Sequence, residues 1–325
     1  MNRSEVIAHL GADWTAFEKL FRDALLSDVP LLNKLNESVL SNSGKQLRPM
    51  LSLLTARACG GACNADSYHY AVVSEILHNA TLIHDDVADE SSLRRGKPTL
   101  ASLMGPTTAV LVGDYWLAKA VSLIIGTGHQ LEVTTLFSRT LSDLAEGEML
   151  QLQKSGEADT TEEDYLRIVF CKTASLFEAT CVSAALSVDA PEERREAARR
   201  YAVATGVAFQ IRDDIFDYWD EANIGKPVGI DLKEQKITMP LLGALRNSVP
   251  SERERIRRMI LDIPRHPEHC AWIHRYVLDN GGVEYASDRL NEYIDEALDA
   301  LKQLPASEDR DVLEKLVKYN AVRKK

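Results

Sequence analysis

Apolar residues recur at spacings of three and four along most of the chain, the period of a helix that buries one face. No segment alternates apolar and polar residues convincingly, so no strand is predicted. The pattern and its breaks predict helices over residues 5–26, 29–40, 46–59, 66–90, 99–125, 129–153, 161–187, 191–219, 235–247, 251–263, 267–280, 284–304 and 308–321. The breaks are short and none resembles an interdomain linker, so we expect one all-α domain over residues 1–325.

Composition narrows the function classes. The 325 residues are 45% hydrophobic, and 38 Lys and Arg against 49 Asp and Glu give a net charge of −11, which disfavours a general nucleic-acid binder. Five cysteines at irregular spacing argue against a disulfide framework and favour the cytoplasm. The N-terminus has no apolar run typical of a signal peptide, and the apolar window 107–126 contains Asp114 and Lys119, so no membrane anchor is expected.

The segment LIHDDVADESSLRRGKPT, residues 82–99, places acids at the end of an apolar helix and follows them with two arginines. Each helical residue turns by about 100°, so Asp85 and Asp89 lie within about 40° of one another. Asp86 and Glu90 form the neighbouring pair. The spacing therefore predicts carboxylates that share one helical face.

A second segment, FQIRDDIFDYWD, repeats this spacing at Asp213, Asp214 and Asp217, with Gln210 one turn earlier. If the two clusters faced each other, repulsion would raise their pKa values unless cations were present. Carboxylate oxygens suit Mg²⁺, which keeps several waters and is completed by substrate phosphates. Two unrelated solvated helix ends are the alternative, and it is disfavoured because both clusters lie in otherwise apolar helices.

Basic residues supply the complementary charge. Arg94 and Arg95 follow the first cluster, and arginine is well shaped for bidentate phosphate contact. The other candidate cations are Lys45 and Arg48 in SNSGKQLRP, Lys172 beside Thr173 in CKTASLF, and Lys226 and Lys236 around the loop after the second cluster. Together with the acids they predict a site for one diphosphate held through metal and another held by Lys and Arg.

Seven motifs, in order, resemble the trans-isoprenyl diphosphate synthases of the polyprenyl synthetase family, most closely the bacterial long-chain, octaprenyl type. They are GKQLRPM, EILHNATLIHDDVADESSLRRGKPT, LVGDYWLAKA, AEGEMLQL, CKTASLFEA, GVAFQIRDDIFDYWD and GKPVGIDLKEQKITMPLL. The resemblance implies an antiparallel helical bundle around a central cavity, of the isoprenoid synthase type and usually a homodimer. It also implies two aspartate-rich motifs that hold three Mg²⁺ on an allylic diphosphate.

Carried over by position, the resemblance implies three sets of site residues. The metal ligands would come from Asp85, Asp86, Asp89, Asp213, Asp214 and Asp217, with Asp85, Asp89, Asp213 and Lys172 as the catalytic residues. Isopentenyl diphosphate would contact Lys45, Arg48, His78 and Arg95. The allylic diphosphate would contact Arg94, Lys172, Thr173, Gln210, Lys226 and Lys236. Two positions depart from expectation: Gln235, where relatives often have Gly, and Arg212, for which the sequence suggests no role.

The chemistry fits these residues. An allylic C–O bond ionises when metal and Lys or Arg charges neutralise the leaving diphosphate. The carbocation then needs an apolar cavity, where the isopentenyl double bond attacks it before a proton is lost. We expect the departing diphosphate to take that proton, so no protein base is assigned.

The residues one turn before Asp85 are expected to line the pocket for the growing chain. Ala80, Thr81 and Ser74 are small. In the family that the chain resembles, bulky aromatic side chains near this position act as a floor that stops chain growth at farnesyl. From Thr81 back to Ser74 is about 10 Å of helix, and Leu77 is the first sizeable side chain on the way. This favours a long-chain product with octaprenyl as the single best choice, formed from farnesyl diphosphate or a similar primer. A precursor of quinone side chains, released toward a membrane, is the expected role.

Four alternatives remain. A short-chain farnesyl or geranylgeranyl synthase would use the same motifs. A class I terpene cyclase would have a different second metal motif, and a His-Asp phosphohydrolase, suggested by His84–Asp85, would need more suitably spaced histidines. A non-catalytic partner subunit is disfavoured by the intact acids of both clusters.

Overall fold

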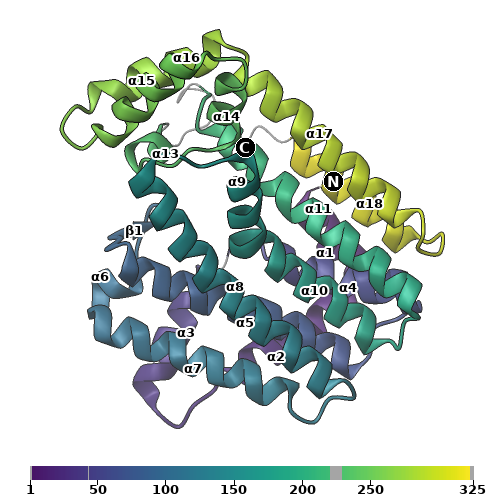
Figure 1. Ribbon diagram of the computed structural model, residues 1–325. Coiled ribbons are helices and arrows are strands. Elements are labelled where there is room, and N and C mark those ends of the chain that lie inside the picture. Colours follow the sequence, from purple (N-terminus) through teal and green to yellow (C-terminus); the bar gives the residue numbers. More distant parts are fainter. Residues whose placement is uncertain (1, 43, 220–228, 323–325) are drawn as a thin grey trace. The chain divides into compact units, whose positions relative to one another are not determined.

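The computed structural model describes residues 2–42, 44–219 and 229–322, whose regular structure is almost entirely helical (Figure 1). The first elements are α1 (Arg3–Leu10), α2 (Ala12–Ala24), α3 (Pro30–Ser41), α4 (Leu47–Gly60), α5 (Ala65–Ala88), β1 (Leu93–Arg94), β2 (Lys97–Pro98), α6 (Leu100–Met104), α7 (Pro106–Ile124) and α8 (Gln130–Glu157). The others are α9 (Glu162–Val169), the π-helical segment η1 (Phe170–Ala174), α10 (Ser175–Ser187), α11 (Glu192–Phe216), α13 (Ile230–Lys233), α14 (Met239–Leu245), α15 (Pro250–Leu261), α16 (Glu268–Asp279), α17 (Gly282–Leu301) and α18 (Glu308–Val322). The predicted all-α class is confirmed.

Two predicted helices are each broken by a glycine with positive φ. The chain turns between α1 and α2 at Gly11 (φ 55°) and between α6 and α7 at Gly105 (φ 83°), so neither helix runs through. Pro106 then begins α7, where its missing N–H costs no helical hydrogen bond. Apolar spacing continues across both breaks, which is why the pattern alone predicted single helices.

The prediction that the chain has no strand was wrong. β1 and β2 form a small antiparallel hairpin in which Leu93 pairs with Pro98 and Arg94 with Lys97. Each strand has only two residues, too few for an alternating pattern to be visible in the sequence. The hairpin fixes the arginine segment that follows the first acidic cluster.

Helical boundaries also differ around the later motifs. Residues 235–247 were predicted to be one helix, but α14 begins only at Met239, with Pro240 in its first turn. The predicted helix 161–187 is continuous but widens to a π-helical turn at Phe170–Ala174. Such turns are rare and occur often at functional sites.

The contacts divide the chain into two compact units. The first contains residues 1–138, 179–199 and 303–313, and the second contains residues 139–178, 200–302 and 314–325. The sequence-based expectation of one domain stays a prediction.

Helix α5 is the central element of the first unit, where it packs against α2, α4 and α7. Asn64 caps its N-terminus through a capping box with Ser67, which defines where the helix begins. Close packing on α7 requires Gly113, because a Cβ there would overlap the His84 ring. This packing holds the C-terminal turn of α5, and hence the first acidic cluster, on a rigid support.

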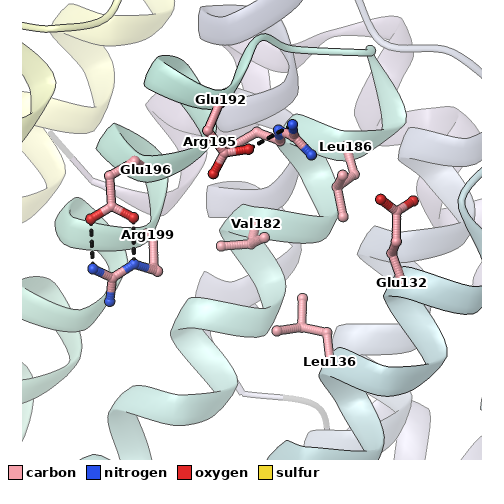
Figure 2. Close-up of a pocket in the computed structure, with 8 residues that line it drawn as sticks. All are labelled: Glu132, Leu136, Val182, Leu186, Glu192, Arg195, Glu196 and Arg199. Atoms are coloured by element: carbon pink, nitrogen blue, oxygen red, sulfur yellow. Dashed lines mark hydrogen bonds and ion pairs between the residues drawn. The ribbon is translucent and has the colours of Figure 1, made fainter.

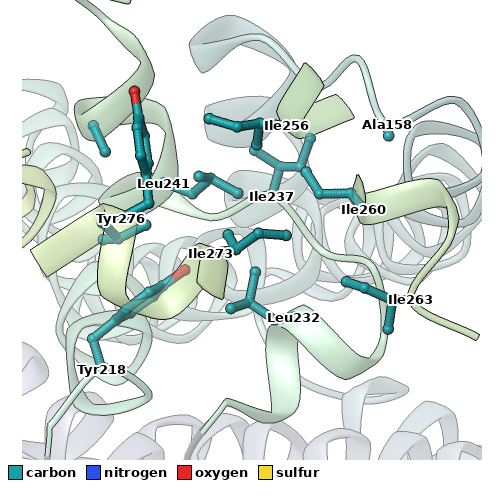
Figure 3. Packing of buried hydrophobic residues seen from close by; sticks show 12 residues of the cluster. Ala158, Tyr218, Leu232, Ile237, Leu241, Ile256, Ile260, Ile263, Ile273 and Tyr276 are labelled. Carbon is teal, nitrogen blue, oxygen red and sulfur yellow. The ribbon is translucent and has the colours of Figure 1, made fainter. Parts of the chain in front are cut away.

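The second unit has a core built from α13 to α16 and the segment after α11 (Figure 3). Its buried side chains include Tyr218, Leu232, Ile237, Leu241 and Ile273. Leu232 and Ile237 bracket the turn before α14, so their burial fixes the backbone beside the second acidic cluster.

Two helical segments among the described residues are long and apolar enough to cross a membrane, Pro106–Ile124 and Glu162–Ser187. Core helices of soluble proteins meet the same criterion, and 72% of the second apolar window is buried. Only 33% of the apolar window in Pro106–Ile124, which is α7, is buried. Helix α7 therefore presents an apolar face that packing within the unit does not cover.

Candidate functional site

The first acidic cluster lies at the C-terminal end of α5. Asp85 and Asp89 are exposed, whereas Asp86 is 6% exposed. Carbonyl groups give this end of a helix a partial negative charge, and no basic residue lies in the last turn to offset it. Three carboxylates at such a position favour the arrival of a cation.

Asp86 already has a cationic partner. Arg94 Nε, on β1, donates a hydrogen bond of 2.7 Å to Asp86 Oδ1. Asp86 is a predicted metal ligand, whereas Arg94 is a predicted contact of the allylic diphosphate. The structure brings them into direct contact, so Asp86 also positions Arg94.

A group of arginines surrounds His78 and Glu75 on the same unit. The guanidinium of Arg95 packs on the backbone of Gly44, where a Cβ would overlap it, so Arg95 lies beside the loop that carries Lys45. Burial lowers the pKa of Arg48 to about 10, opposed by the neighbouring Glu75 carboxylate. The four residues predicted for isopentenyl diphosphate, Lys45, Arg48, His78 and Arg95, therefore all lie in this unit.

The loop before α4 has additional support from the N-terminus. Arg3 donates to the Lys45 carbonyl (3.3 Å) and to Gln46 Oε1 (2.7 Å). Gln46 has the left-handed conformation (φ 52°), which turns the chain into α4. Nothing in the sequence had singled out Arg3.

His78 is predicted to be neutral at physiological pH. Burial, followed by the positive charges of Arg48, Arg95 and Arg94, holds the pKa of His78 well below its usual 6.5. Below pH 6.5 the unfolded chain therefore binds a proton at this histidine that the folded chain does not. Because that proton favours the unfolded state, the free energy of unfolding decreases as the pH falls through 6.5.

For this reason, the free energy of unfolding of the wild type, relative to that of His78→Gln, should fall by about 1.4 kcal/mol between pH 7.5 and pH 5.5. Urea unfolding of both proteins at the two pH values measures the difference. His69→Gln, which removes a partly exposed histidine of the same helix, is the matched control. An equal fall in the free energy of unfolding of wild type and His78→Gln would contradict a neutral His78 in the folded protein.

The second acidic cluster ends α11, again without a basic residue in the last turn. Asp213 is partly exposed, with 43% of its side chain accessible. Asp214 is buried and accepts hydrogen bonds from Tyr165 Oη (2.5 Å) and Gln210 Nε2 (2.8 Å). Burial, and then the Asp231 carboxylate, raise the pKa of Asp214 well above its usual value.

The carboxylate of Asp217 binds the backbone at Ile230 and Asp231. Its two carboxylate oxygens accept from the N–H groups of Ile230 and Asp231, at 3.1 Å each. It thereby places Asp231, whose pKa is raised to about 6 by burial and by the Asp217 charge. Asp231 is a fourth acid that the sequence reading missed, although it lies within the motif GKPVGIDLKEQKITMPLL.

The π-helical turn carries Lys172 and Thr173. Lys172 Nζ donates to Gln151 Oε1 (3.0 Å) and pairs with Glu148, while Thr173 donates to Gln210 Oε1 (3.1 Å). Gln210 thus links Thr173 to Asp214. A hydrogen-bonded chain therefore connects two of the predicted diphosphate contacts, Thr173 and Gln210, with one acid, Asp214.

A cavity of about 200 Å³ in the second unit is lined by these groups. Its wall includes five of the predicted residues, Lys172, Thr173, Gln210, Asp214 and Lys236, together with Asp231. Another predicted allylic contact, Lys226, lies outside the described residues.

The two departures in the sequence now have structural descriptions. Gln235 has a positive φ of 58°, the conformation in which glycine is unstrained, and its side chain donates to the Ile260 carbonyl (2.9 Å). Lys236 N–H bonds to the Asp231 carbonyl (2.8 Å), so the lysine backbone is well fixed despite the missing glycine. Arg212 is buried beside Asp213.

A second cavity, of about 230 Å³, lies in the first unit between α8, α10 and α11 (Figure 2). Its arginines are already paired, Arg195 with Glu192 and Arg199 with Glu196, each at 2.6 Å. It contains none of the predicted site residues. We assign it no role.

Each unit therefore holds one acidic cluster with its own cations. Within the described ranges, no three His, Cys, Asp or Glu side chains already meet as a metal-binding group. The donors nevertheless fit a hard cation that keeps its waters, because Asp85, Asp89 and Asp213 present accessible carboxylates.

Comparison with known proteins agrees with this geometry. The model of the polyprenyl synthetase family matches residues 29–277. The all-trans-nonaprenyl-diphosphate synthase (geranyl-diphosphate specific) of Rhodobacter capsulatus is 38% identical over 97% of this chain and 96% of its own. The octaprenyl diphosphate synthase of Escherichia coli K12 is 36% identical over 96% of both chains.

A solved structure is also similar, that of a polyprenyl synthase from Caulobacter crescentus CB15 complexed with calcium and isoprenyl diphosphate. It has a TM-score of 0.88 and 33% identity and covers 100% of this chain and 98% of that one. The chain belongs to the polyprenyl synthetase family, and it is a prenyltransferase. The predicted family, fold class and enzyme class are confirmed.

Proposed function

We propose that this enzyme is an all-trans, long-chain polyprenyl diphosphate synthase that adds isopentenyl diphosphate units to an allylic diphosphate, with octaprenyl diphosphate as its main product. The observation that carries the proposal is the pairing of an aspartate cluster with diphosphate-binding cations in each unit. The names of the two relatives, a nonaprenyl and an octaprenyl synthase, support a long chain.

The proposed cation is Mg²⁺, three per active site, as the family resemblance implies. Asp85, Asp89 and Asp213 would be its most direct ligands because their carboxylates are accessible. When bound, the metal supplies the positive charge that makes diphosphate a better leaving group. The calcium in the Caulobacter structure supports a divalent cation.

This chain's own cations complete the neutralisation. Lys172 and Lys236 line the cavity of the second unit and supply fixed charge for the leaving diphosphate. Lys45, Arg48 and Arg95 would hold isopentenyl diphosphate, with neutral His78 as a hydrogen-bonding partner. The departing diphosphate would take the proton released after carbon–carbon bond formation.

We place the growing chain along α5. Thr81, Leu77 and Ser74 lie within about 80° of Asp85 around the helix, while Ala80 lies about 140° away. Ser74 and Ala80 are fully buried and Leu77 is 3% exposed. We therefore propose Thr81 as the principal size-determining residue near the acids, with Ala80 acting through the packing behind it.

We also propose a cytoplasmic homodimer that releases its product toward a membrane for quinone synthesis. The apolar face of α7 supports an association between copies. Val110, Leu111 and Val121 are 38%, 63% and 51% exposed and lie within about 100° on this helix, and Ile125, directly after it, is 66% exposed.

Lys172→Met should lower kcat/KM for the allylic substrate by about 10–100-fold, the factor expected for loss of a charged hydrogen bond. Much of the change should appear in kcat, because the ammonium stabilises the negative charge that the diphosphate gains as the C–O bond breaks. Steady-state kinetics with varied allylic diphosphate measure it. Lys233→Met, at an exposed lysine of α13, is the control. An unchanged kcat/KM in Lys172→Met would contradict the assignment.

The class of reaction is tested by measuring pyrophosphate release from the purified chain. Release should require Mg²⁺, isopentenyl diphosphate and an allylic diphosphate together. Release from the allylic substrate alone would indicate a cyclase, and no release with any primer would favour a non-catalytic partner subunit.

A further inference from the structure

Arg212 is a buried cation at the second acidic cluster for which the proposed chemistry has no role. It is 5% exposed, and its neighbour in sequence is Asp213. Arg212 Nη2 lies 2.8 Å from Asp213 Oδ1 and donates a charge-assisted hydrogen bond to it.

Two aromatic rings hold the guanidinium in place. Its central carbon lies 4.6 Å from the ring centroid of Phe209 and 5.4 Å from that of Phe216. Both rings are on α11, one turn before and one turn after Arg212, so all three side chains follow one stripe of a rigid helix. A buried guanidinium between two rings has little freedom, and its hydrogen bond therefore fixes the carboxylate that accepts it.

The charge balance of the cluster explains why a cation is needed. Asp213, Asp214, Asp217 and Asp231 lie close enough for their charges to act on one another. The oxygens of Asp214 and Asp217 are engaged by Tyr165, Gln210 and backbone N–H groups. Asp213, with 43% of its side chain accessible, is the most exposed of the three motif acids.

We propose that Arg212 is a positioning residue for divalent-cation binding: it holds Oδ1 of Asp213 and presents the carboxylate, through its other oxygen, to the metal. This inference rests on the proposed function, because it assumes that Asp213 is a metal ligand. Groups that orient a ligand in this way typically alter metal affinity by about 10–100-fold when they are removed. A competing effect, relief of repulsion between Arg212 and the metal, would change affinity in the opposite direction.

The test measures metal binding without turnover. Thermal unfolding is followed while Mg²⁺ is titrated in the presence of farnesyl thiodiphosphate, an unreactive allylic diphosphate. For Arg212→Met, the Mg²⁺ concentration that gives half of the stabilisation should rise by about 10-fold or more. Arg212→Lys keeps the charge but loses the planar guanidinium. Its half-stabilising Mg²⁺ concentration should lie between those of wild type and Arg212→Met.

Two further variants locate the effect. Arg255→Met, on α15, removes another guanidinium that stacks on an aromatic ring, that of Trp272 on α16 at 4.8 Å, and should leave the Mg²⁺ midpoint unchanged. Adding Arg212→Met to Asp213→Asn should shift the midpoint no further than Asp213→Asn alone, because the arginine acts through that carboxylate.

The outcomes separate the two proposals. A wild type that Mg²⁺ and the analogue fail to stabilise would overturn the proposed function and this inference with it. A responsive wild type, with Arg212→Met or Arg212→Lys responding at the same or lower Mg²⁺ concentration, would overturn the inference alone. If Arg212→Met does not fold, the midpoint of Arg212→Lys decides.

Discussion

Asp85→Asn is expected to lower the rate of prenyl transfer by about 10²–10³-fold, the usual cost of losing one electrostatic contact that stabilises a transition state. The substitution keeps the size of the side chain but removes the charge that would hold a cation on the leaving diphosphate. Asp85 is exposed at the end of α5, so the fold should tolerate the change, with the free energy of unfolding within about 0.5 kcal/mol of wild type.

The measurement is kcat at saturating isopentenyl and allylic diphosphates, together with the melting temperature of each protein. Asp23→Asn, at an exposed aspartate of α2 in the same unit, is the matched control and should keep wild-type activity. If Asp85→Asn retains more than about a tenth of wild-type kcat, the first cluster is not the metal site that the account requires.

Thr81→Phe is expected to shorten the main product by at least one isoprene unit. The product length should shift toward farnesyl or geranylgeranyl. Thr81 lies one turn before Asp85 on α5, and its hydroxyl donates to the His78 carbonyl (2.9 Å). A phenyl ring there would fill the space into which the chain grows. Because Thr81 is half-buried, the ring should also cost about 1–3 kcal/mol of stability.

Chain-length analysis of the products, made with the same primer for each protein, tests this effect. Thr15→Phe adds the same ring at an exposed threonine of α2, whose hydroxyl also bonds to the preceding turn, and should leave the product unchanged. A folded Thr81→Phe enzyme with the wild-type product distribution would show that the chain does not pass this residue.

The sequence predicted the acids well because their signal is local. The spacing of Asp85 and Asp89, like that of Asp213 and Asp217, follows from helical geometry, and both clusters are indeed at helix ends. The candidate cations were proposed for the same reason, since each lies in a short motif, and their roles stay a prediction.

Features that depend on tertiary contacts were not predictable in this way. Asp231 is held at the second cluster by backbone N–H groups that bind Asp217, a contact between residues 14 positions apart that helical spacing does not encode. The burial of Asp86 and Asp214 likewise depends on Arg94 and Tyr165, which come from other elements. The hairpin at residues 93–98 was missed because two-residue strands have no readable period.

The product made by the purified chain decides whether the enzyme is a long-chain synthase. The chain is incubated with Mg²⁺, isopentenyl diphosphate and, in separate reactions, geranyl, farnesyl or geranylgeranyl diphosphate, and the dephosphorylated products are identified by mass spectrometry. We expect linear all-trans products longer than geranylgeranyl, with octaprenyl the most abundant. A main product of farnesyl or geranylgeranyl length, or a cyclised hydrocarbon, would contradict it.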